Sequence, residues 1–581
     1  MVLVGRRLAI TRGVVVAALI AIVAVVIAIA AVSYAFSKTS TSAGQATVTK
    51  SKTQVSGLEI VWKTDPLVDK SWLIQKGLYI RSWTWYNFLK GSVVSSPDGR
   101  FVAVTTQKGE VFIFSSNGKK LKDLTFGLGR VPYSMTFSPD GRYFAVGLSS
   151  KYGEVLVYDT SSWEVVWSYK ADKDLLGPSN ATEATITKSP WYGNSINFIE
   201  FDKSGKRLYF VADGKIINEK SQRPVYEKVS VDLMNIYPEI RKKYPDLKEY
   251  RISMWVGVYV SRLVAVDVSS WKVAWRWPKN EPAGVMIPMF STDSGDRYVA
   301  LCTWWGYNPK EPAKWHGGTV FVLRADNGDQ LWRWDIPPRV PVFNRTTIWN
   351  GIGISSDGKY VVVEPSDGRI FVVNNEESVK KGEPVLAWKA TIMSPIQSEI
   401  LLIPKNKGNY TSIKSYIYAG TYFAGIVDGK VVPYASATYS VYWSPKYERK
   451  PMIQHPNQTK LFIFDLSTGK LLYIDKFFGK PMYGKVVPFA RDGNLLIGCV
   501  GNDWITSDAS MSGVYVWDTS RLKLVARFLT LMPEKYGVPL DVSASGNRIY
   551  VLVGPVDLAT GPEGPSKIVG EYRLIALELG S

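Results

Sequence analysis

Short apolar runs alternate with one recurring polar element along most of this chain. The clearest copies are residues 96–100 (Ser-Pro-Asp-Gly-Arg) and residues 138–142, which have the same sequence. An Asp-Gly pair between two apolar runs predicts a tight β-hairpin, because glycine accepts the positive φ that the turn requires. Weaker copies surround Gly205, Gly295, Gly358, Gly493 and Gly546.

A second element follows these hairpins: an Asp that ends one apolar run and an aromatic residue that lies in the next. Asp159 precedes Trp163 and Trp167, and Asp267 precedes Trp271 and Trp275. Related copies carry an aromatic residue at or near the last position: Trp332, Trp388 and Tyr473. Each repeat therefore contains four strands, two joined by the Asp-Gly turn and two by the Asp-to-Trp turn. Repeated four-stranded units of this kind predict a β-propeller.

The number of repeats follows from the spacing of the turns. The interval from Gly358 to Gly493 is too long for one unit, and residues 461–473 within it form a half-unit without a visible Asp-Gly partner. The sequence thus predicts an all-β, eight-bladed β-propeller over residues 57–581, with seven blades as the alternative. Residues 572–578 look like a third strand without a fourth. We expect the strand at residues 58–63 to complete that last blade and close the ring.

The N-terminal region predicts a membrane anchor. Residues 14–36 form an uncharged apolar stretch, long enough as a helix to span the bilayer, and Arg6, Arg7 and Arg12 precede it. By the positive-inside rule, residues 1–13 are expected in the cytoplasm and the propeller outside, as in a single-pass plasma-membrane protein. A cleaved signal peptide and a prepilin-type cleavage site at Arg12-Gly13 are the alternatives. Residues 37–56 are small and polar and predict a flexible stalk.

The composition excludes several classes of function. The formal net charge of +19 is spread along the chain without a basic arm, which argues against nucleic-acid binding. Cys302 and Cys499 are the two cysteines, so no disulfide framework or Cys-rich zinc site is expected. His316 and His455 are the two histidines, which argues against catalysis by a Ser-His-Asp arrangement or a His-based metal site. We therefore expect a binding protein and no catalytic or metal-ligating residue.

Long insertions point to a binding face. They fall between second and third strands, at about residues 213–255, 303–318, 421–459, 502–512 and 554–570. In a propeller these connections open on one face, and insertions clustered there usually mark the binding surface. The insertion at residues 229–243 has helix-like spacing and predicts a small cap on that face.

Aromatic residues in these insertions are candidate anchors for a protein or a glycan, although they could instead pack together to hold the loops. The candidates are Trp304, Trp305, Tyr307, Trp315, His316, Tyr439, Tyr442, Trp443 and Trp504. Four Asn-x-Ser/Thr sequons are candidate glycosylation sites of a cell-surface glycoprotein: Asn180, Asn344, Asn409 and Asn457.

The run from Ala265 to Trp275 resembles the tryptophan-docking motif of quinoprotein (PQQ-like) propellers, with Trp271 in place of the motif's glycine. The Ser-Pro-Asp-Gly-Arg turns resemble those of WD-repeat and YVTN-type propellers. The quinoprotein resemblance implies pyrroloquinoline quinone, calcium and a catalytic Asp, often with a disulfide between adjacent cysteines. This chain has no adjacent cysteines, so no cofactor is expected, and PQQ and calcium belong only to the alternative of a divergent oxidoreductase. The leading hypothesis is a membrane-anchored binding scaffold or receptor for a protein or glycan, and a lectin-like or glycan-processing protein is a further alternative.

Overall fold

The computed structural model describes residues 56–78, 93–106, 108–232, 251–257, 259–304, 314, 317–337, 351–365, 368–392, 400–404, 410–443, 460–476, 486–489, 494–500, 512–531, 533–557 and 567–580. They belong to one compact unit, Val55–Ser581. Among these residues, no helix is both long enough and apolar enough to cross a membrane. The predicted membrane span at residues 14–36 and nearly all of the predicted stalk lie outside the described residues.

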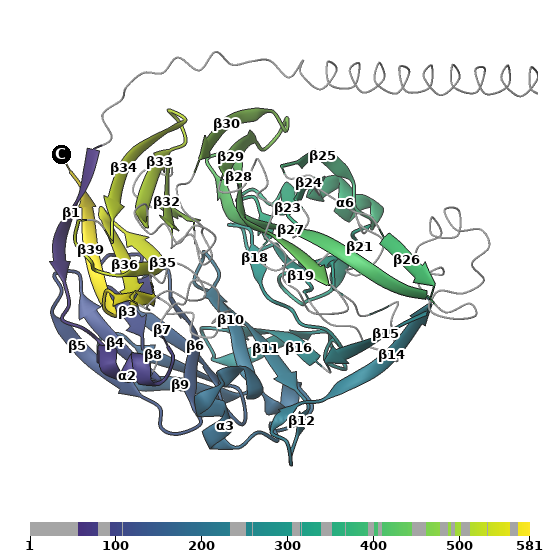
Figure 1. Cartoon of the computed structure of the whole chain (residues 1–581), viewed down its shortest axis with the longest axis horizontal. Coiled ribbons are helices and arrows are strands. Elements are labelled where there is room, and N and C mark those ends of the chain that lie inside the picture. The colour runs from purple at the N-terminus through teal and green to yellow at the C-terminus, as the bar shows by residue number, and fades with distance from the viewer. Residues whose placement is uncertain are drawn as a thin grey trace, which may run out of the picture. The chain divides into compact units, whose positions relative to one another are not determined.

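The fold is all-β, and its main antiparallel sheets are named A to H here in chain order (Figure 1). Within each sheet the strands are given below in their order in space. This is also their order along the chain, except that in sheet H the N-terminal strand β1 lies beside β39. Sheet A contains β2 (Val93–Ser95), β3 (Phe101–Thr105), β4 (Glu110–Ser115) and β5 (Lys120–Thr125); sheet B contains β6 (Val131–Phe137), β7 (Tyr143–Ser149), β8 (Glu154–Asp159) and β9 (Val165–Lys170); sheet C contains β10 (Ser195–Phe201), β11 (Arg207–Lys215), β16 (Tyr259–Asp267) and β17 (Lys272–Trp277); sheet D contains β18 (Phe290–Thr292), β19 (Tyr298–Cys302), β20 (Thr319–Arg324) and β21 (Gln330–Asp335).

The second half of the unit repeats this plan. Sheet E contains β22 (Ile352–Ile354), β23 (Tyr360–Val363), β24 (Arg369–Asn374) and β25 (Leu386–Thr391); sheet F contains β26 (Ile400–Pro404), β27 (Tyr410–Val427), β28 (Lys430–Trp443), β29 (Lys460–Asp465) and β30 (Leu471–Lys476); sheet G contains β31 (Val486–Phe489), β32 (Leu495–Val500), β33 (Gly513–Asp518) and β34 (Lys523–Leu529); sheet H contains β35 (Val538–Ser545), β36 (Arg548–Gly554), β39 (Arg573–Leu579) and β1 (Ser56–Lys63).

Apolar clusters hold each sheet against the next. Between sheets A and B, Val111 and Ile113 pack in one buried cluster with Phe144 and Val146. Equivalent clusters join B to C, C to D, D to E, E to F, F to G and G to H. The last sheet also packs on the first: one buried cluster contains residues of β36 and β39 together with residues of β3 and β4. The sheets therefore follow one another around a ring, as Figure 1 shows, and the architecture is a β-propeller.

Sheet H contains strands from both ends of the described chain. β1 pairs antiparallel with β39, so that Leu58 lies opposite Leu579, Ile60 opposite Leu577 and Lys63 opposite Ile575. The pairing is the one expected from the sequence for residues 58–63. β1 also pairs parallel with β34 of sheet G at Ser56 and Gly57. This strand therefore covers an edge that β39 would otherwise expose.

Sheet F corrects two expectations. Its half-unit was expected to lack an Asp-Gly turn, but Asp428 and Gly429 join β27 to β28, with φ of 46° and 66°. The expected insertion at residues 421–459 begins too early, since residues 421–427 pair as a strand of the sheet itself. β27 and β28 continue past the sheet as a long hairpin, and β26 pairs with the far end of β27.

The two ends of the strands differ. Connections between first and second strands and between third and fourth strands lie at one end, which we call the turn end. In sheet F the first strand in this sense is β27, which Asp428 and Gly429 join to β28. Connections between second and third strands, and those from one sheet to the next, lie at the other end, called the loop end. Most turn-end connections are short, apart from α6 (Asn375–Lys381) in sheet E. Most of the long connections are at the loop end.

The predicted helical cap at residues 229–243 is wrong at its start. Residues 229–232 belong to β14 (Tyr226–Asp232), which pairs with β15 (Arg251–Gly257). The alternation of Val229 and Val231 with polar residues favours a strand, because β-branched side chains suit a pleated backbone. Residues 233–250 lie outside the described residues. Other loop-end elements are β12 (Ile217–Asn218), β13 (Arg223–Pro224), β37 (Val556–Asp557), β38 (Ile568–Val569), α2 (Lys70–Gln75), α3 (Glu183–Lys188) and the 3₁₀ turns η1 (Asp172–Asp174) and η2 (Pro190–Tyr192).

Tryptophan side chains on outermost strands donate hydrogen bonds to the third-to-fourth-strand turn of the following sheet. The indole Nε1 of Trp275 in sheet C donates to the carbonyl oxygen of Ala325 in sheet D at 2.7 Å. Its ring lies against Gly328, where a Cβ atom would come within 2.6 Å of Trp275. Equivalent contacts join Trp62 of sheet H to Ser116 of sheet A, and Trp388 of sheet E to Leu466 of sheet F.

Candidate functional site

The loop end of sheets B, C and D carries long connections that contain short helices and hairpins of their own. The connection from sheet B to sheet C contains η1, α3 and η2, and the insertion of sheet C contains two added hairpins. Side chains and backbone groups join these segments. Thr182 N–H donates to the side chain of Gln222 at 2.9 Å, and Ser179 N–H donates to the carbonyl of Lys151 at 2.7 Å. Hydrogen bonds therefore join the connections that form this surface.

A buried ion pair lies beneath this surface. Lys215 Nζ is 2.7 Å from Asp213 Oδ2, and both side chains are fully buried at the loop end of β11. The ammonium also lies 3.8 Å from the centre of the Trp191 ring, on η2. Ser261 donates its hydroxyl hydrogen to Asp213 Oδ1 at 3.0 Å. Lys215 thus links the sheet B–C connection to sheet C.

The ion pair also affects the innermost strand of sheet B. Burial, together with the nearby charge of Asp213, raises the pKa of the Tyr133 hydroxyl above its ordinary value. Tyr133 is the extra residue of a bulge between β6 and β7, since Pro132 pairs with Leu148 and Ser134 with Gly147. Bulges of this kind redirect a side chain and are frequent beside functional sites.

Asn197 occupies the same kind of position on β10 of sheet C. The register shifts between Ile196 and Phe198, so Asn197 is the extra residue there. Its side chain is buried and its oxygen accepts from the Ser195 hydroxyl at 3.2 Å. Its Nδ2 group makes no hydrogen bond within the described residues. A buried amide of this kind is satisfied by a water or by an acceptor group of a ligand.

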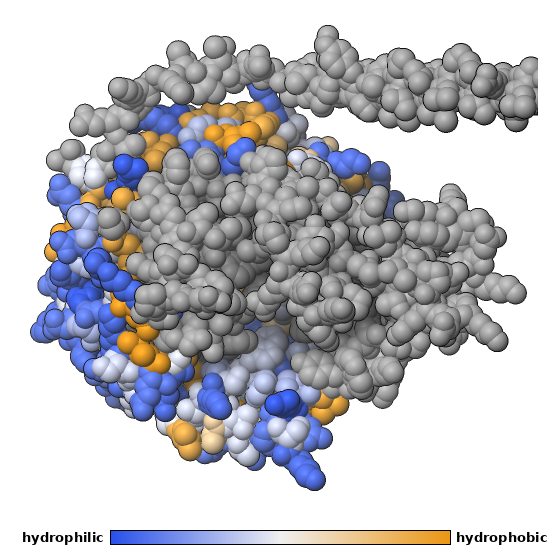
Figure 2. All heavy atoms as spheres, viewed as in Figure 1, coloured by the Kyte–Doolittle hydropathy of each residue, from blue (hydrophilic) through white to orange (hydrophobic). Residues whose placement is uncertain are grey.

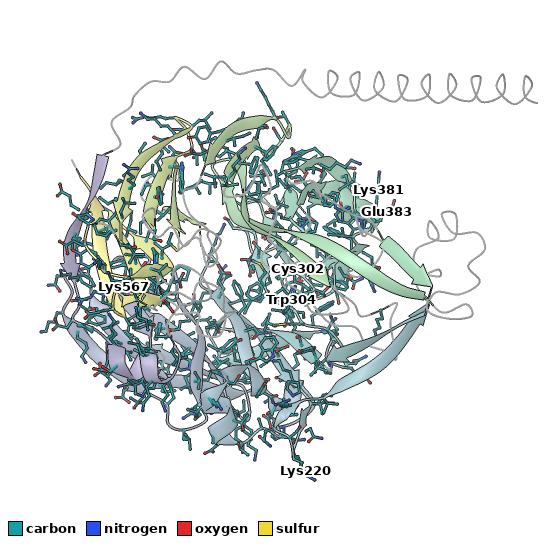
Figure 3. The ribbon with its side chains drawn as sticks, in the orientation of Figure 1. Lys220, Cys302, Trp304, Lys381, Glu383 and Lys567 are labelled. Carbon is teal, nitrogen blue, oxygen red and sulfur yellow. The ribbon has the colours of Figure 1, made fainter. Side chains whose placement is uncertain are left out.

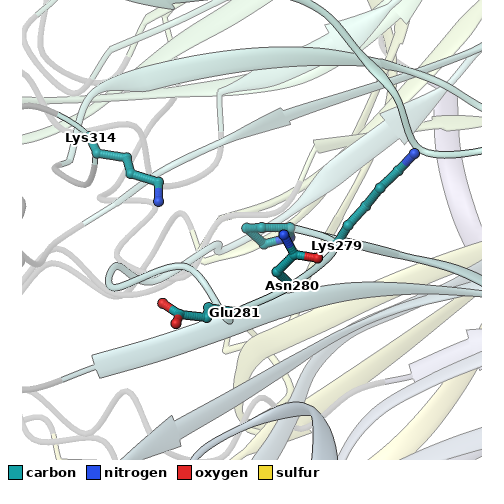
Figure 4. A pocket seen from close by; sticks show the side chains of 5 residues that line it. Lys279, Asn280, Glu281 and Lys314 are labelled. Carbon is teal, nitrogen blue, oxygen red and sulfur yellow. The ribbon is translucent and has the colours of Figure 1, made fainter.

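A hollow of about 360 Å³ opens between the sheet C–D connection and the insertion of sheet D (Figure 4). It is lined by Pro278, Lys279, Asn280, Glu281 and Lys314. In Figure 4 the Lys279 side chain extends away from the other three labelled residues, and its Nζ forms an ion pair with Asp329. The lining therefore presents an ammonium, a carboxylate and an amide, a mixture suited to polar groups of either charge.

A buried arginine fixes the backbone of this hollow. Arg262, which is 6% exposed, donates from Nε to the Pro278 carbonyl at 2.9 Å and from Nη2 to the Lys279 carbonyl. Burial lowers the pKa of its guanidinium. The connection also meets sheet C through paired backbone hydrogen bonds between Ser261 and Ala283. Hydrogen bonds to Arg262 and Ser261 therefore fix the connection that forms one side of the hollow.

Of the aromatic candidates predicted from the sequence, Trp304 is the one whose side chain is described. It follows Cys302 at the end of β19 (Figure 3) and is half-buried, and its N–H donates to the Met286 carbonyl at 2.9 Å. Tyr439, Tyr442 and Trp443 lie on β28, opposite Tyr418, Ser415 and Lys414 of β27. The remaining candidates lie outside the described residues: Trp305, Tyr307, Trp315, His316 and Trp504.

Of the candidate glycosylation sites, Asn180 is described. It is exposed in the connection between η1 and α3, and Thr182 of the same sequon caps α3 by accepting from the Thr185 N–H. Asn344, Asn409 and Asn457 lie outside the described residues.

Sequence reasoning missed the ion pair and the hollow. The sequence holds a signal for the ion pair: Asp213 directly follows the apolar run from Leu208 to Ala212, and Lys215 comes two residues later. Charges in such a strand are rarely buried unless they are paired. Cys302 and Cys499 are both buried and not joined by a disulfide. Within the described ranges, no group of three or more His, Cys, Asp or Glu side chains is placed to hold a metal ion.

Comparison with known proteins gives a likeness of fold only. No family model matches the chain, and no curated protein matches it. Among solved structures, the C-terminal WD40 domain of Sif2 is 11% identical with a TM-score of 0.47, and the alignment covers 91% of this chain and 100% of that one. Sqt1 of Saccharomyces cerevisiae is 12% identical with a TM-score of 0.44, covering 87% and 99%. The assignment as a propeller rests on the sheets and clusters described above.

Proposed function

We propose that this chain is an eight-bladed β-propeller scaffold that binds a protein partner at the loop end of sheets B, C and D. Sheets A to H would be its eight blades, with β1 as the outermost strand of the last. The observation that carries the proposal is the contrast between the ends: long, mutually bonded connections at one end and mostly short turns at the other. Binding residues commonly lie on loops that a rigid scaffold positions.

A protein is the favoured partner because of what the surface offers. The hollow between residues 278–281 and Lys314 carries charges of both signs, which suits the mixed side chains of a protein surface. Trp304, half-buried in the same insertion of sheet D as Lys314, supplies an aromatic group of the kind that often anchors an interface. The ion pair of Asp213 and Lys215 holds the adjoining connection in place, which lowers the entropy cost of binding.

The proposed location is the cell surface. Residues 14–36 would anchor the chain in the membrane, residues 37–56 would separate the propeller from it, and Asn180 would be open to glycosylation. A partner could then be another protein of the same membrane or one outside the cell.

Site-specific photo-crosslinking on intact membranes tests the proposal. A crosslinker at Glu281 should capture a protein partner, identified by mass spectrometry, whereas one at Glu377 on α6 at the turn end should not. Capture from Glu377 alone would contradict the proposed surface. Binding of the full chain to a glycan array, lost in Trp304→Ala, would instead favour the lectin-like alternative.

A further inference from the structure

The outermost strands of sheets A to F are edge strands, those of sheets G and H pair with each other only at Ser56 and Gly57, and charges lie within most of them. An unpaired edge exposes backbone N–H and C=O groups that can bind a strand of another chain, and charged side chains are the common protection. In Figure 2 the visible rim of the described residues is largely hydrophilic, interrupted by apolar residues. Charges fall within the edge strands at Lys122 and Asp123 in β5, Arg276 in β17, Arg333 in β21, Lys389 in β25, Asp475 in β30, Arg527 in β34 and Glu59 in β1.

β9 of sheet B departs from this pattern. Its residues 165–169 (Val-Val-Trp-Ser-Tyr) are uncharged, and the one charge of the strand is Lys170 at its last position. This is the longest uncharged run among the outermost strands that the structure describes. Val165 is 48% exposed and Val166 is 44% exposed, so two β-branched apolar side chains face solvent on an open edge.

The edge is also held rigidly. The Trp167 ring stacks on Trp271 of sheet C with centroids 5.6 Å apart, and the Tyr169 hydroxyl donates to Asp174 Oδ2 at 2.6 Å. Arg276 in turn forms an ion pair with Asp174. Contacts with sheet C therefore hold β9 in place, so it loses little further conformational entropy when another strand pairs with it.

The charges that flank the run are self-complementary. Glu164 immediately precedes β9 and Lys170 ends it, and both are exposed. If two copies of the strand pair antiparallel about Trp167, Glu164 of each copy lies opposite Lys170 of the other. The same register places Val165 opposite Tyr169, and it places Val166, the extra residue of a bulge between β8 and β9, opposite Ser168. Opposite charges and apolar pairs directly across an antiparallel ladder are both favourable.

From these observations we propose that β9 is the contact edge of a two-fold symmetric homodimer, in which the β9 strands of two copies pair antiparallel and join their B sheets. In a two-fold symmetric dimer both copies contribute the same surface, which must therefore be self-complementary. The run from Glu164 to Lys170 meets this condition. The edge lies at the rim of the propeller, so the proposal does not depend on the loop-end function.

Sedimentation velocity of the full chain in detergent tests the proposal. The wild-type chain should sediment as a dimer. Val166→Lys should raise its dissociation constant about tenfold or more, because a charged side chain then lies on the edge that pairs. Leu471→Lys is the matched control: Leu471 is a 43% exposed leucine on the outermost strand β30, and its replacement should leave the dimer intact. Both variants should keep the wild-type circular dichroism spectrum.

A charge exchange tests the register. Glu164→Lys alone places like charges opposite each other and should weaken the dimer, whereas Glu164→Lys combined with Lys170→Glu should restore it. A monomeric wild-type chain would overturn the proposal, as would a dimer that Val166→Lys leaves unchanged or that Leu471→Lys weakens equally. Failure of the double exchange to restore what the single exchange loses would overturn the antiparallel pairing.

Discussion

At the scale of single residues, the turns between third and fourth strands show how one position adapts to its neighbour. The left-handed position is glycine at Gly328, where the ring of Trp275 leaves no room for a Cβ atom. At the corresponding turns of sheets B and C it is Trp163 and Trp271, with φ of 57° and 53°. There Trp167 of sheet B stacks on the Trp271 ring itself. At Trp271 the contact between the rings of neighbouring sheets compensates for the unfavourable φ of the tryptophan.

Replacing Gly328 should therefore destabilise the protein through two effects. Gly328→Ala introduces a side chain at φ +74° and places its Cβ against Trp275. Gly382→Ala is the matched control, because Gly382 has φ +73° and no atom within 4 Å of a built Cβ. Urea denaturation should show a loss of about 1 kcal/mol for the control and about 2 kcal/mol more for Gly328→Ala. Equal losses would mean that the tryptophan contact does not constrain the turn.

The buried ion pair predicts strong coupling between its members. Lys215→Met leaves the Asp213 carboxylate buried without its ammonium and should cost about 3–5 kcal/mol of unfolding free energy. Adding Asp213→Leu removes that charge, so the double variant should be more stable than Lys215→Met alone. A double-mutant cycle by urea denaturation measures this coupling. Additive losses would argue against the direct pairing.

At the scale of elements, the third-to-fourth-strand turns are stabilised by an aspartate at their start. Asp267 Oδ1 accepts from the hydroxyl of Ser269 at 2.6 Å and from the N–H of Ser270 at 2.9 Å. Asp159 and Asp465 are placed in the same way at the turns of sheets B and F. The repeat seen in the sequence is thus a repeat of hydrogen bonding.

These turns should make the protein sensitive to acid. The hydrogen bond from the Ser269 hydroxyl, with those from Ser270, holds the pKa of Asp267 below its ordinary 3.8. A lowered pKa in the folded state adds stability above the unfolded pKa, and that stability is lost as the pH falls through the folded value. The urea midpoint should therefore decrease below about pH 4. Asp267→Asn should show a smaller decrease, and an equal one would exclude this turn as a source of the sensitivity.

Much of the fold followed from such local signals, because a turn and the strands beside it are specified by adjacent residues. Asp140 and Gly141 predict their hairpin without reference to the rest of the chain. The turn at Asp428 was missed because β27 and β28 extend beyond the sheet. The strands on either side of this turn are therefore longer than those beside the other Asp-Gly turns. The hollow beside Glu281 and the Asp213 ion pair could not be predicted, since their residues meet only when connections from different sheets fold together.

At the scale of the whole molecule, stability depends on the contact between sheets H and A. Trp62 on β1 donates from Nε1 to the Ser116 carbonyl at 2.8 Å and packs beside Phe114 and Tyr550. Arg548 donates to the same carbonyl oxygen. One tryptophan therefore connects the closing strand, its own sheet and the first sheet.

Trp62→Ala should weaken this closure. We expect a loss of about 3–5 kcal/mol and an increase in proteolysis at β1, because the cavity and the lost hydrogen bond both lie at the joint. Glu59→Ala, at an exposed position of the same strand, is the control and should change little. Thermal unfolding and limited proteolysis measure both effects. Proteolysis at another sheet, with β1 protected, would contradict the assigned role.

The strand that completes sheet H also imposes an order on biosynthesis. Thr64, just after β1, bonds to Leu574, which lies 510 positions further along the chain. β1 leaves the ribosome before any other described strand, and its antiparallel partner β39 leaves after all the others. The earliest strand must therefore wait, accessible to chaperones and proteases, until translation has delivered the strand beside which it belongs.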